Sequence, residues 1–580
     1  DKPTRVYGTS ATLIDNIFSN DLESYHLSGN IVSDASDHFV QLCFSSTNIS
    51  ITDYHHNTKI RDYSNFSEHK FVQELQNTDW LKVALKPDVN SSFSFFYKKF
   101  NNIVNKHAPL KKPSKRKLKN LGKPWITKGI RIAINKKHKL LLNGNRELYK
   151  IYRNELTSLI RMSKKNHYFK YFETNITKSK AIWKGINELV AIKKSKKKTI
   201  NCIKRSDSTF TSDPGEISNT LNKFFAEVGS NLASGIPSTG ESVTEYLGQP
   251  NSNTFSFLPV IPNDIIEEII ALPQNKATGL YSCPVRILKI ASKVIAGPLS
   301  HIMNKSIETG IYPNKLKIAN IIPVHKADDK TEIGNYRPIS LLSIFNRIFE
   351  KLMYTRLMGF VDKYNLLFDS QYGFRAHHNT EQAIIDITHK INQNMDQGRY
   401  TCGIFIDLKK AFDTVDHDIL ITKLHHYGVR GIVLDWFRSY LTNRKQTVSI
   451  NGAISNYQSV SCGVPQGSVL GPLLFLIYIN DIYKSSKTLS FYLFADDTTI
   501  LYDNKDLNEL QHIVNNDLSS LSTWLKTNRL SLNVKKTNFV IFKPRQKKLP
   551  FSPSFYIPNN SNTPQLICHK DTIRYLGVLL

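Results

Sequence analysis

Acidic residues are nearly missing from one stretch of this 580-residue chain. Residues 101–200 contain no Asp and only four Glu, against 28 Lys or Arg, which gives the stretch a net charge of +24. So strong an imbalance excludes a neutral surface and favours contact with a polyanion such as a nucleic acid backbone. The alternative for such a run is a solvated linker. Interleaved Tyr and Phe residues favour nucleic acid contact.

Cysteine is also scarce, with six residues and no pair in Cys-x-x-Cys spacing. This excludes a zinc knuckle or a dithiol redox motif of that spacing and fits a reducing compartment. The longest near-apolar run, residues 469–479, is interrupted by Gly471 and Pro472 and is too short to cross a bilayer. No signal peptide is visible. We therefore expect a protein of the nucleus and cytoplasm without a membrane partner.

Three carboxylates stand at the ends of strand-like runs. Residues 402–406 are mostly apolar or aromatic and lead directly into Asp407. Residues 489–501 have the pattern of a strand, a turn and a strand, with Asp496 and Asp497 in the turn, which predicts a β-hairpin. Adjacent carboxylates repel each other unless they are solvated or neutralised by a divalent cation. Together the three predict a magnesium site, because this hard cation prefers oxygen ligands.

These carboxylates lie in a series of motifs that resembles the reverse transcriptases of non-LTR retrotransposons, of the LINE type and jockey-like. The motifs occur in the family's order: 335–342 (NYRPISLL), 371–375 (QYGFR), 405–413 (FIDLKKAFD), 463–472 (GVPQGSVLGP), 494–497 (FADD), 532–537 (LNVKKT) and 574–578 (RYLGV). Residues 275–279 (NKATG) resemble the first fingers motif. The Asp-Gly that follows it in many relatives is replaced here by residues 280–283 (LYSC).

The resemblance implies an α+β fold, with the fingers and palm of a right-hand polymerase over residues 256–580 and the thumb missing. Residues 47–255 would form a basic, largely helical linker and N-terminal extension. The implied activity is RNA-directed DNA polymerase, which copies retrotransposon RNA from a primer 3′-hydroxyl. Its partners would be an RNA template, a DNA primer or target, and deoxynucleoside triphosphates. The oligomeric state cannot be read from the sequence.

The resemblance also implies a role for each matching residue in the metal site. Asp407 and Asp496 would be the main ligands of two Mg²⁺ ions, for which Mn²⁺ is able to substitute. Asp497 would support them, and the main-chain carbonyl of Leu408 would contribute. Phe412 would exclude a ribose 2′-hydroxyl and so select deoxynucleotides.

Further residues would contact the nucleotide. Gln466 and Gly467 would lie against the incoming nucleotide and the template, where Gly permits close approach. Lys326 and Arg337 would hold the triphosphate. Arg375 would lie near the same pocket, with a structural salt bridge as its alternative. Lys536 would donate a proton to pyrophosphate, with a plain surface role as its alternative.

The front of the chain resembles the last part of an apurinic-type endonuclease domain of the endonuclease/exonuclease/phosphatase type. The matching residues are Asp15, Asp37 and His38, in which a carboxylate would orient an imidazole toward a scissile phosphate. Residues 1–46 would thus be a small, β-rich endonuclease remnant. The chain begins at Asp1 and ends on an apolar run, so we expect both ends to be cut, and we expect no endonuclease activity from this fragment.

Two rival functions stay open at this point. A catalytically inactive remnant would only bind RNA or DNA, although the three intact carboxylates disfavour it. An RNA-dependent RNA polymerase would need room for a ribose 2′-hydroxyl, which Phe412 disfavours.

Overall fold

The computed structural model divides the chain into two units, Asp1–Asn57 and Thr58–Leu580, and each is described by itself. It describes residues 3–7, 10–17, 25–31, 38–45, 60–111, 123–143, 145–190, 200–205, 207–274, 279, 283–559 and 562–580. The first unit consists of two antiparallel strand pairs, β1 (Arg5–Tyr7) with β2 (Ser10–Thr12) and β3 (Tyr25–Ile31) with β4 (Val40–Ser45). An isolated bridge between Arg5 and His38 connects the two pairs.

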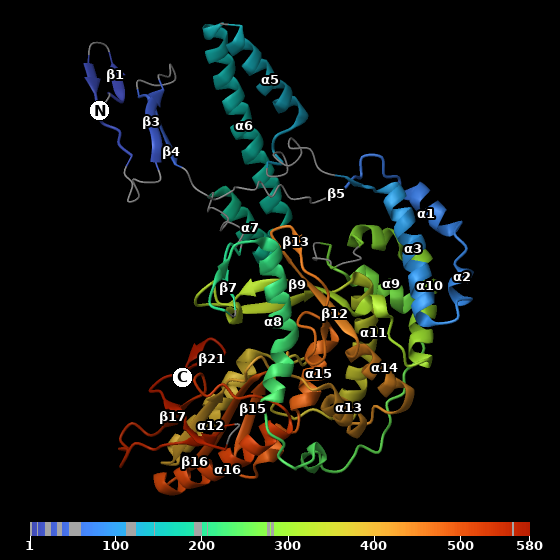
Figure 1. Ribbon diagram of the computed structural model, residues 1–580, viewed down its shortest axis with the longest axis vertical. Helices are drawn as coiled ribbons and strands as arrows, with labels where there is room; N and C mark the ends of the chain where they lie inside the picture. The colour runs from blue at the N-terminus through green and yellow to red at the C-terminus, as the bar shows by residue number, and fades with distance from the viewer. Residues whose placement is uncertain are drawn as a thin grey trace. The chain divides into compact units, whose positions relative to one another are not determined.

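The second unit mixes helices and strands (Figure 1). Its helices are α1 (Glu68–Gln76), α2 (Leu81–Ala84), α3 (Val89–His107), α5 (Lys128–Leu142), α6 (Arg146–Thr174), α7 (Ser179–Leu189), α8 (Pro214–Ser234), α9 (Pro262–Ala271), α10 (Val285–Glu308), α11 (Ile344–Lys363), α12 (Thr380–Asp396), α13 (His417–His426), α14 (Gly431–Leu441), α15 (Leu470–Ile479) and α16 (Leu507–Thr527). Short 3₁₀ turns are η1 (Val243–Tyr246), η2 (Asn314–Lys317), η3 (Ile333–Asn335) and η4 (Ile482–Ser485).

The strands of this unit are β5 (Ile60–Arg61), β6 (Leu110–Lys111), β7 (Ile203–Lys204), β8 (Phe210–Thr211), β9 (Ile318–His325), β10 (Tyr336–Leu341), β11 (Tyr400–Ile406), β12 (Arg444–Ile450), β13 (Ala453–Ile454), β14 (Gln458–Val460), β15 (Ser490–Phe494), β16 (Asp497–Asn504), β17 (Asn538–Phe542), β18 (Tyr556–Pro558), β19 (Pro564–Leu566), β20 (Cys568–His569), β21 (Arg574–Tyr575) and β22 (Val578–Leu579). A mixed α+β architecture is therefore confirmed.

The sheet that carries the predicted catalytic strands has the order β15-β16-β11-β17-β20. All its neighbours are antiparallel except β17 and β20. β11 lies in the centre, and its side chains are almost all buried, as a continuous apolar run requires. α12 and α16 pack on this sheet. α16 begins where the Asp506 carboxylate accepts the amides of Asn508 and Glu509, as N-cap residues do.

A second sheet has the order β10-β9-β12-β13, with β14 also paired to β12. α8 packs on it and buries Ile217, Leu221 and Phe225 against Ile321 and Val448. The polar composition of residues 201–255 predicts mostly linker around one helix. The structure confirms the one predicted helix, 214–233, as α8, whose apolar residues recur on one helical face. It differs from the linker prediction at the β7–β8 pair, where buried Ile203 shares the core with Ile217 and Ile321.

The largest core joins residues that are far apart in the sequence. Phe93, Phe96 and Phe100 of α3 surround Phe345 of α11, with ring centroids 5.6 Å apart for Phe96 and 5.9 Å apart for Phe100. Both contacts are edge-to-face, a favoured geometry for aromatic pairs. α3 therefore belongs to the same packed body as α11.

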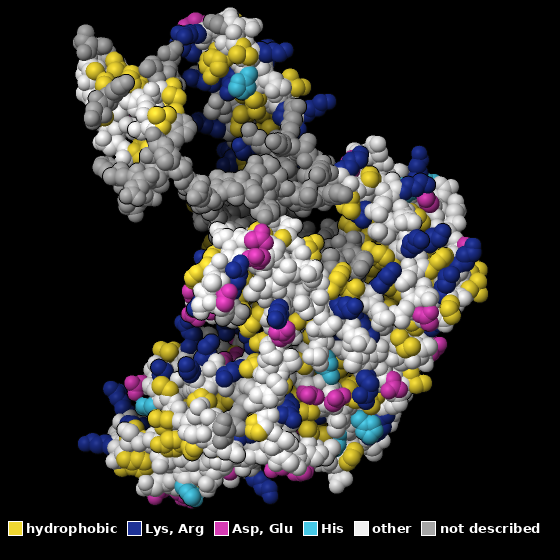
Figure 2. Space-filling view, viewed as in Figure 1, with side chains coloured by type: hydrophobic (Ala, Val, Ile, Leu, Met, Phe, Trp, Pro, Cys, Tyr) yellow, Lys and Arg dark blue, Asp and Glu magenta, His cyan; other side chains and the backbone are white. Residues whose placement is uncertain are grey.

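Residues 123–190, which we call the basic arm, contain the antiparallel helices α5 and α6, followed by α7. Buried Tyr168 of α6 packs against Trp125, with ring centroids 5.6 Å apart. The arm carries 16 Lys or Arg against four Glu. Within its described residues the only ion pair joins Lys150 and Glu147, at 3.9 Å. Dark-blue Lys and Arg side chains are spread along α5 and α6 (Figure 2).

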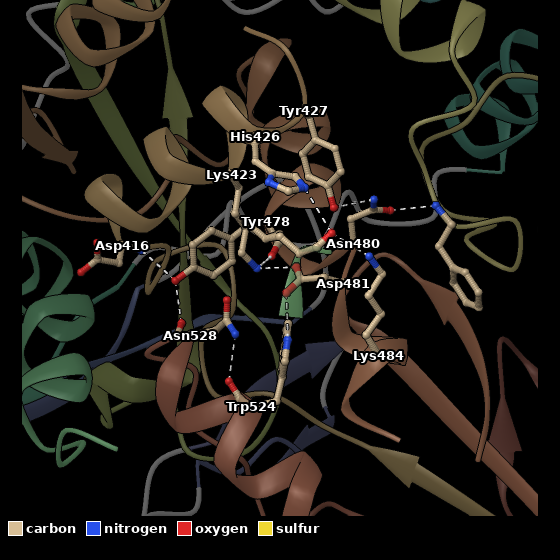
Figure 3. A network of polar contacts seen from close by, with 12 residues as sticks. Asp416, Lys423, His426, Tyr427, Tyr478, Asn480, Asp481, Lys484, Trp524 and Asn528 are labelled. Carbon is tan, nitrogen blue, oxygen red and sulfur yellow. Dashed lines mark hydrogen bonds and ion pairs between the residues drawn. The ribbon is translucent and has the colours of Figure 1, made fainter. Parts of the chain in front are cut away.

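A buried polar network fastens α13, α15 and α16 together (Figure 3). Lys423 of α13 and Asp481 are both fully buried and form an ion pair at 2.5 Å. Lys423 also donates to the Tyr478 carbonyl at 2.5 Å, and the Trp524 indole donates to Asp481 Oδ2 at 3.0 Å.

Among the described residues, no helix is both long and apolar enough to cross a membrane.

Candidate active site

The three predicted carboxylates lie at the same end of the neighbouring strands β11, β15 and β16. Asp407 follows the last residue of β11, and Ala495 and Asp496 form the turn between β15 and β16. β11 pairs with β16 up to Ile406 and Thr498, which places Asp407 and Asp497 one step beyond this last pair. The turn is tight, because Ala495 adopts a left-handed conformation with φ of 58°.

The electrostatics of these carboxylates show excess negative charge. Partial removal from water raises the pKa of Asp497 to about 6, and the nearby charges of Asp496 and Asp407 add to the rise. Burial likewise raises the pKa of Asp496, with a contribution from Asp407. The positive charges of Lys326 and Arg337 act in the opposite direction on the pKa of both. A bound cation would relieve this repulsion.

The donor set fits a hard divalent cation, because it consists of carboxylate oxygens with excess negative charge. Among the described residues, however, no three His, Cys, Asp or Glu side chains already stand in metal-binding geometry. Asp407 Oδ2 instead accepts a hydrogen bond of 2.7 Å from Asn533 Nδ2, and its carbonyl accepts the Asn533 amide at 2.8 Å. Leu408 beside it bridges to Leu532.

A group of cations faces the carboxylates. Lys326 follows β9, and Arg337 lies on β10 opposite Val324. Lys410 adds to this positive charge. Burial lowers the pKa of its ammonium, the charge of Asp413 opposes this effect, and the charges of Lys326, Arg337 and Lys536 lower the pKa further. In the space-filling view, Lys and Arg side chains line a hollow between the part that carries β7 and the part that carries β17 and β21 (Figure 2).

Lys410 was not among the residues predicted from the sequence. Its Nζ donates to the carbonyls of Gly334 and Tyr336, both at 3.2 Å, so it connects the segment 405–413 to the start of β10. The sequence feature that could have identified it is its place as the second of two adjacent Lys residues in the segment 405–413. Lys536 is exposed in the turn before β17, where its amide donates to the Asn533 carbonyl at 3.0 Å.

Gln466 and Gly467 lie against β10. The Ser340 amide donates to the Gln466 carbonyl at 2.8 Å. Gly467 has φ of 114°, and a Cβ there would lie 2.9 Å from the Ser340 carbonyl oxygen. A side chain at this position would therefore be strained and crowded. The loop that bears both residues is thus held close to the strand that carries Arg337.

Phe412 lies among other aromatic rings beside the same loop. Its ring stacks on Phe475 of α15, with centroids 4.5 Å apart, and meets the edge of Phe374 at 6.3 Å. Its carbonyl accepts the Val464 amide at 2.8 Å. These contacts hold the ring of Phe412 in a fixed position beside the loop of Gln466.

The segment 371–375 braces the carboxylate hairpin. Gln371 Oε1 accepts the Ala495 amide at 3.1 Å and the Gly373 amide at 2.9 Å. A Cβ on Gly373 would lie only 2.4 Å from the Ala495 nitrogen, so this close approach requires glycine. Arg375 donates to the carbonyls of Phe368 and Gln371 at 3.0 and 3.3 Å, which fixes its own loop. Gln371 was missed by sequence reasoning.

The first unit brings Asp15 and His38 together. His38 Nδ1 and Asp15 Oδ2 lie 2.8 Å apart, and this hydrogen bond lowers the pKa of the Asp15 carboxyl. Gln41 donates to the Asp15 carbonyl at 2.8 Å. Asp37 lies outside the described residues, as do residues 275–278 of the NKATG segment and residues 280–282 that follow it.

The part of the chain that carries these residues is similar to known proteins. Residues 324–580 match the family of reverse transcriptases (RNA-dependent DNA polymerases). The chain is 32% identical over 311 residues to the probable RNA-directed DNA polymerase from transposon BS of Drosophila melanogaster. The aligned region covers 51% of this chain and 34% of that protein. It is 28% identical over 346 residues to the RNA-directed DNA polymerase from mobile element jockey of the same fly, covering 58% of this chain and 37% of that protein.

A probable RNA-directed DNA polymerase from transposon X-element, also of Drosophila melanogaster, is 28% identical over 345 residues, covering 59% of this chain and 37% of that protein. The chain thus spans about a third of the length of these curated relatives. The matches fall on the part of the chain that carries the carboxylates, the cations and the Gln466 loop. Residues 324–580 therefore match the reverse transcriptase family, and the chain is similar to the RNA-directed DNA polymerases of the jockey, BS and X-element mobile elements.

Proposed function

We propose that this chain is an RNA-directed DNA polymerase that extends a primer 3′-hydroxyl with deoxynucleotides on an RNA template. One observation carries the proposal: Asp407, Asp496 and Asp497 lie at the same end of neighbouring strands, and the positive charges of Lys326 and Arg337 lower the pKa of Asp496 and Asp497. This arrangement suits a nucleoside triphosphate, whose phosphates need cations on one side and metal-bearing carboxylates on the other. In the reaction the 3′-oxygen bonds to the α-phosphorus, the bond to pyrophosphate breaks, and the hydroxyl proton leaves.

The carboxylates would hold two Mg²⁺ ions, with Mn²⁺ able to substitute and the Leu408 carbonyl as an additional ligand. When bound, these ions would lower the pKa of the primer hydroxyl and stabilise the leaving pyrophosphate. Lys326 and Arg337 would bind the triphosphate oxygens. Lys536 would supply a proton to pyrophosphate. Gln466 and Gly467 would border the nucleotide, and Arg375 would act indirectly by shaping its loop.

Primer extension tests this function. Purified protein, an RNA template with an annealed DNA primer, deoxynucleotides and magnesium should give full extension of the primer. A parallel reaction with ribonucleotides separates an RNA-dependent RNA polymerase from a DNA polymerase. Tight, salt-dependent RNA binding without extension in either reaction would support the inactive remnant instead.

Replacing Phe412 with Ala should let ribonucleotides enter the site. The ring is held by Phe475 and Phe374, so it stands as a fixed wall rather than a mobile side chain. We expect the preference for deoxynucleotides, measured as the ratio of kcat/KM values, to fall by roughly tenfold to a hundredfold. Phe412→Tyr keeps the ring and serves as the control. An unchanged ratio in Phe412→Ala would place the sugar-selecting wall elsewhere.

We further propose that the basic arm binds the nucleic acid backbone. Its positive charge is almost unpaired among its described residues, and exposed aromatics such as Phe169 accompany it. Lys139, Lys165 and Lys170 are exposed on α5 and α6. Changing all three to Glu should weaken RNA binding and reduce the slope of log K against log salt by about two, at roughly 0.7 for each single-strand phosphate contact.

The matched control for the arm changes three exposed lysines elsewhere, Lys70, Lys293 and Lys487, to Glu. It produces the same change in net charge, so a long-range charge effect would alter both variants alike. An equal loss of slope in the two variants would contradict a local contact at the arm.

For the first unit, we propose that residues 1–46 are the C-terminal part of an apurinic-type endonuclease domain. The support is the contact between Asp15 and His38, with the carboxylate orienting the imidazole. Asp37 would complete this group of residues.

A further inference from the structure

Asp413 is a buried carboxylate that the proposed chemistry leaves without a role. Its Oδ2 is buried without a hydrogen-bond partner in the described part of the chain. Removal from water raises the pKa of its carboxyl to about 6, while the Gln466 amide and the charge of Lys410 oppose the rise. A carboxylate kept in such surroundings costs stability, which favours a role for it in holding a neighbouring group.

The contact that Asp413 makes is with the nucleotide loop. Gln466 Nε2 donates to Asp413 Oδ1 at 2.8 Å. An ionised carboxylate only accepts hydrogen bonds, so it fixes which end of the Gln466 amide faces it. The Gln466 oxygen must then point away from Asp413. The Ser340 amide holds the main chain of Gln466 at the same time, so both its backbone and its side chain have a defined position.

The main chain of Asp413 is itself held from two sides. Cys462 Sγ donates to the Asp413 carbonyl at 3.3 Å. Gly229 of α8 approaches so closely that a Cβ there would lie 2.0 Å from the same oxygen, and a Cβ on Gly463 would lie 2.7 Å from it. This carbonyl has no room to shift. The position of the carboxylate is therefore set by α8 and by the loop of Gly463.

We propose that Asp413 is a positioning residue of the nucleotide site, which acts by orienting the side-chain amide of Gln466. The inference rests on the proposed polymerase function and deepens it. Asp413 touches neither substrate nor metal in this scheme. Its effect should therefore appear in nucleotide affinity and not in the chemical step.

The test measures deoxynucleotide binding without catalysis. A primer that ends in a dideoxynucleotide cannot be extended, so the protein, the RNA template and this primer form a complex whose retention reports binding of the next complementary deoxynucleotide with magnesium. We expect Asp413→Ala to weaken this binding by about tenfold, the lower end for a residue that orients another. Asp413→Asn keeps an acceptor oxygen and should lie between Ala and the natural residue.

Two comparisons separate positioning from damage to the fold. Gln466→Ala should weaken binding as much as Asp413→Ala, and the double variant should be no weaker than Gln466→Ala alone. The melting temperature should stay within a few degrees, because the substitution also removes a poorly hydrated charge. Asp418→Ala, at a largely exposed carboxylate on α13, is the matched control and should bind like the natural protein.

Specific results would overturn the inference. Unchanged affinity in Asp413→Ala, additive losses in the double variant, or a fall in melting temperature that accompanies lost template binding would each do so. Failure of the natural protein to bind any deoxynucleotide in this complex would overturn the proposed function as well. If it binds nucleotide and Asp413→Ala binds equally well, only this inference fails.

Discussion

Replacing Asp496 with Ala should abolish primer extension on an RNA template. Asp496 lies in the tight turn between β15 and β16, and its carboxylate couples electrostatically to Asp407 and Asp497. Without it the site would lose one of its main cation ligands. We expect the extension rate to fall by roughly 10³-fold or more, the scale seen when a preorganised electrostatic group is removed.

RNA binding is the internal control for this variant. The basic arm and the other cations are untouched in Asp496→Ala, so its affinity for the template should match that of the natural protein. Asp496→Asn keeps the shape of the side chain and should lose activity to a similar extent, because it lacks the charge. Near-normal extension by either variant would show that the cation is held by other groups.

Replacing Asp481 with Ala should severely destabilise the packing of α13, α15 and α16. The variant leaves Lys423 as a fully buried ammonium without its carboxylate partner, while the hydrogen bond to the Tyr478 carbonyl stays in place (Figure 3). Removing one partner of a buried ion pair costs about 3–5 kcal/mol, because the remaining charge is uncompensated. We expect a corresponding fall in the free energy of unfolding, measured by urea titration of tryptophan fluorescence, to which buried Trp524 contributes.

A second variant shows whether the charge is the cause. Combining Asp481→Leu with Lys423→Met removes both charges and should recover much of the lost stability, as apolar replacements of buried pairs often do. Asp418→Ala, in which a mostly exposed pair with Arg438 at 3.7 Å is broken, should cost less than about 1 kcal/mol. If Asp481→Ala costs no more than this control, water must reach Lys423 and the network is less closed than its burial indicates.

Local sequence patterns were sufficient for the elements that bear the carboxylates. The apolar run before Asp407 and the strand-turn-strand pattern around Asp496 predicted β11 and the β15–β16 hairpin, because strand burial and turn chemistry are encoded within a few residues. The sequence pattern of residues 263–272 likewise predicts a helix, and α9 (Pro262–Ala271) begins and ends one residue earlier. The roles of individual side chains stay predictions.

The residues that hold the site together were not predictable in the same way. Asn533 reaches Asp407 across 126 positions, and Gln371 reaches Ala495 across 124. Spacing does not encode such contacts, since they depend on how distant elements pack. In the segment 371–375, the family resemblance placed Arg375 near the nucleotide pocket, with a structural salt bridge as the alternative. In the structure Gln371 braces the hairpin, and Arg375 donates to carbonyls of its own loop.

The packing of α3 and α8 bears on how the polypeptide folds. The match to the reverse transcriptase family begins at residue 324, yet Phe345 packs against Phe96 and Phe100 of α3. In the same way, Ile321 and Val448 share a core with Ile217 of α8. A fragment cut at the border of similarity would expose both apolar surfaces and aggregate. The cooperative folding unit thus starts ahead of α3, more than two hundred residues before the match to the reverse transcriptase family begins.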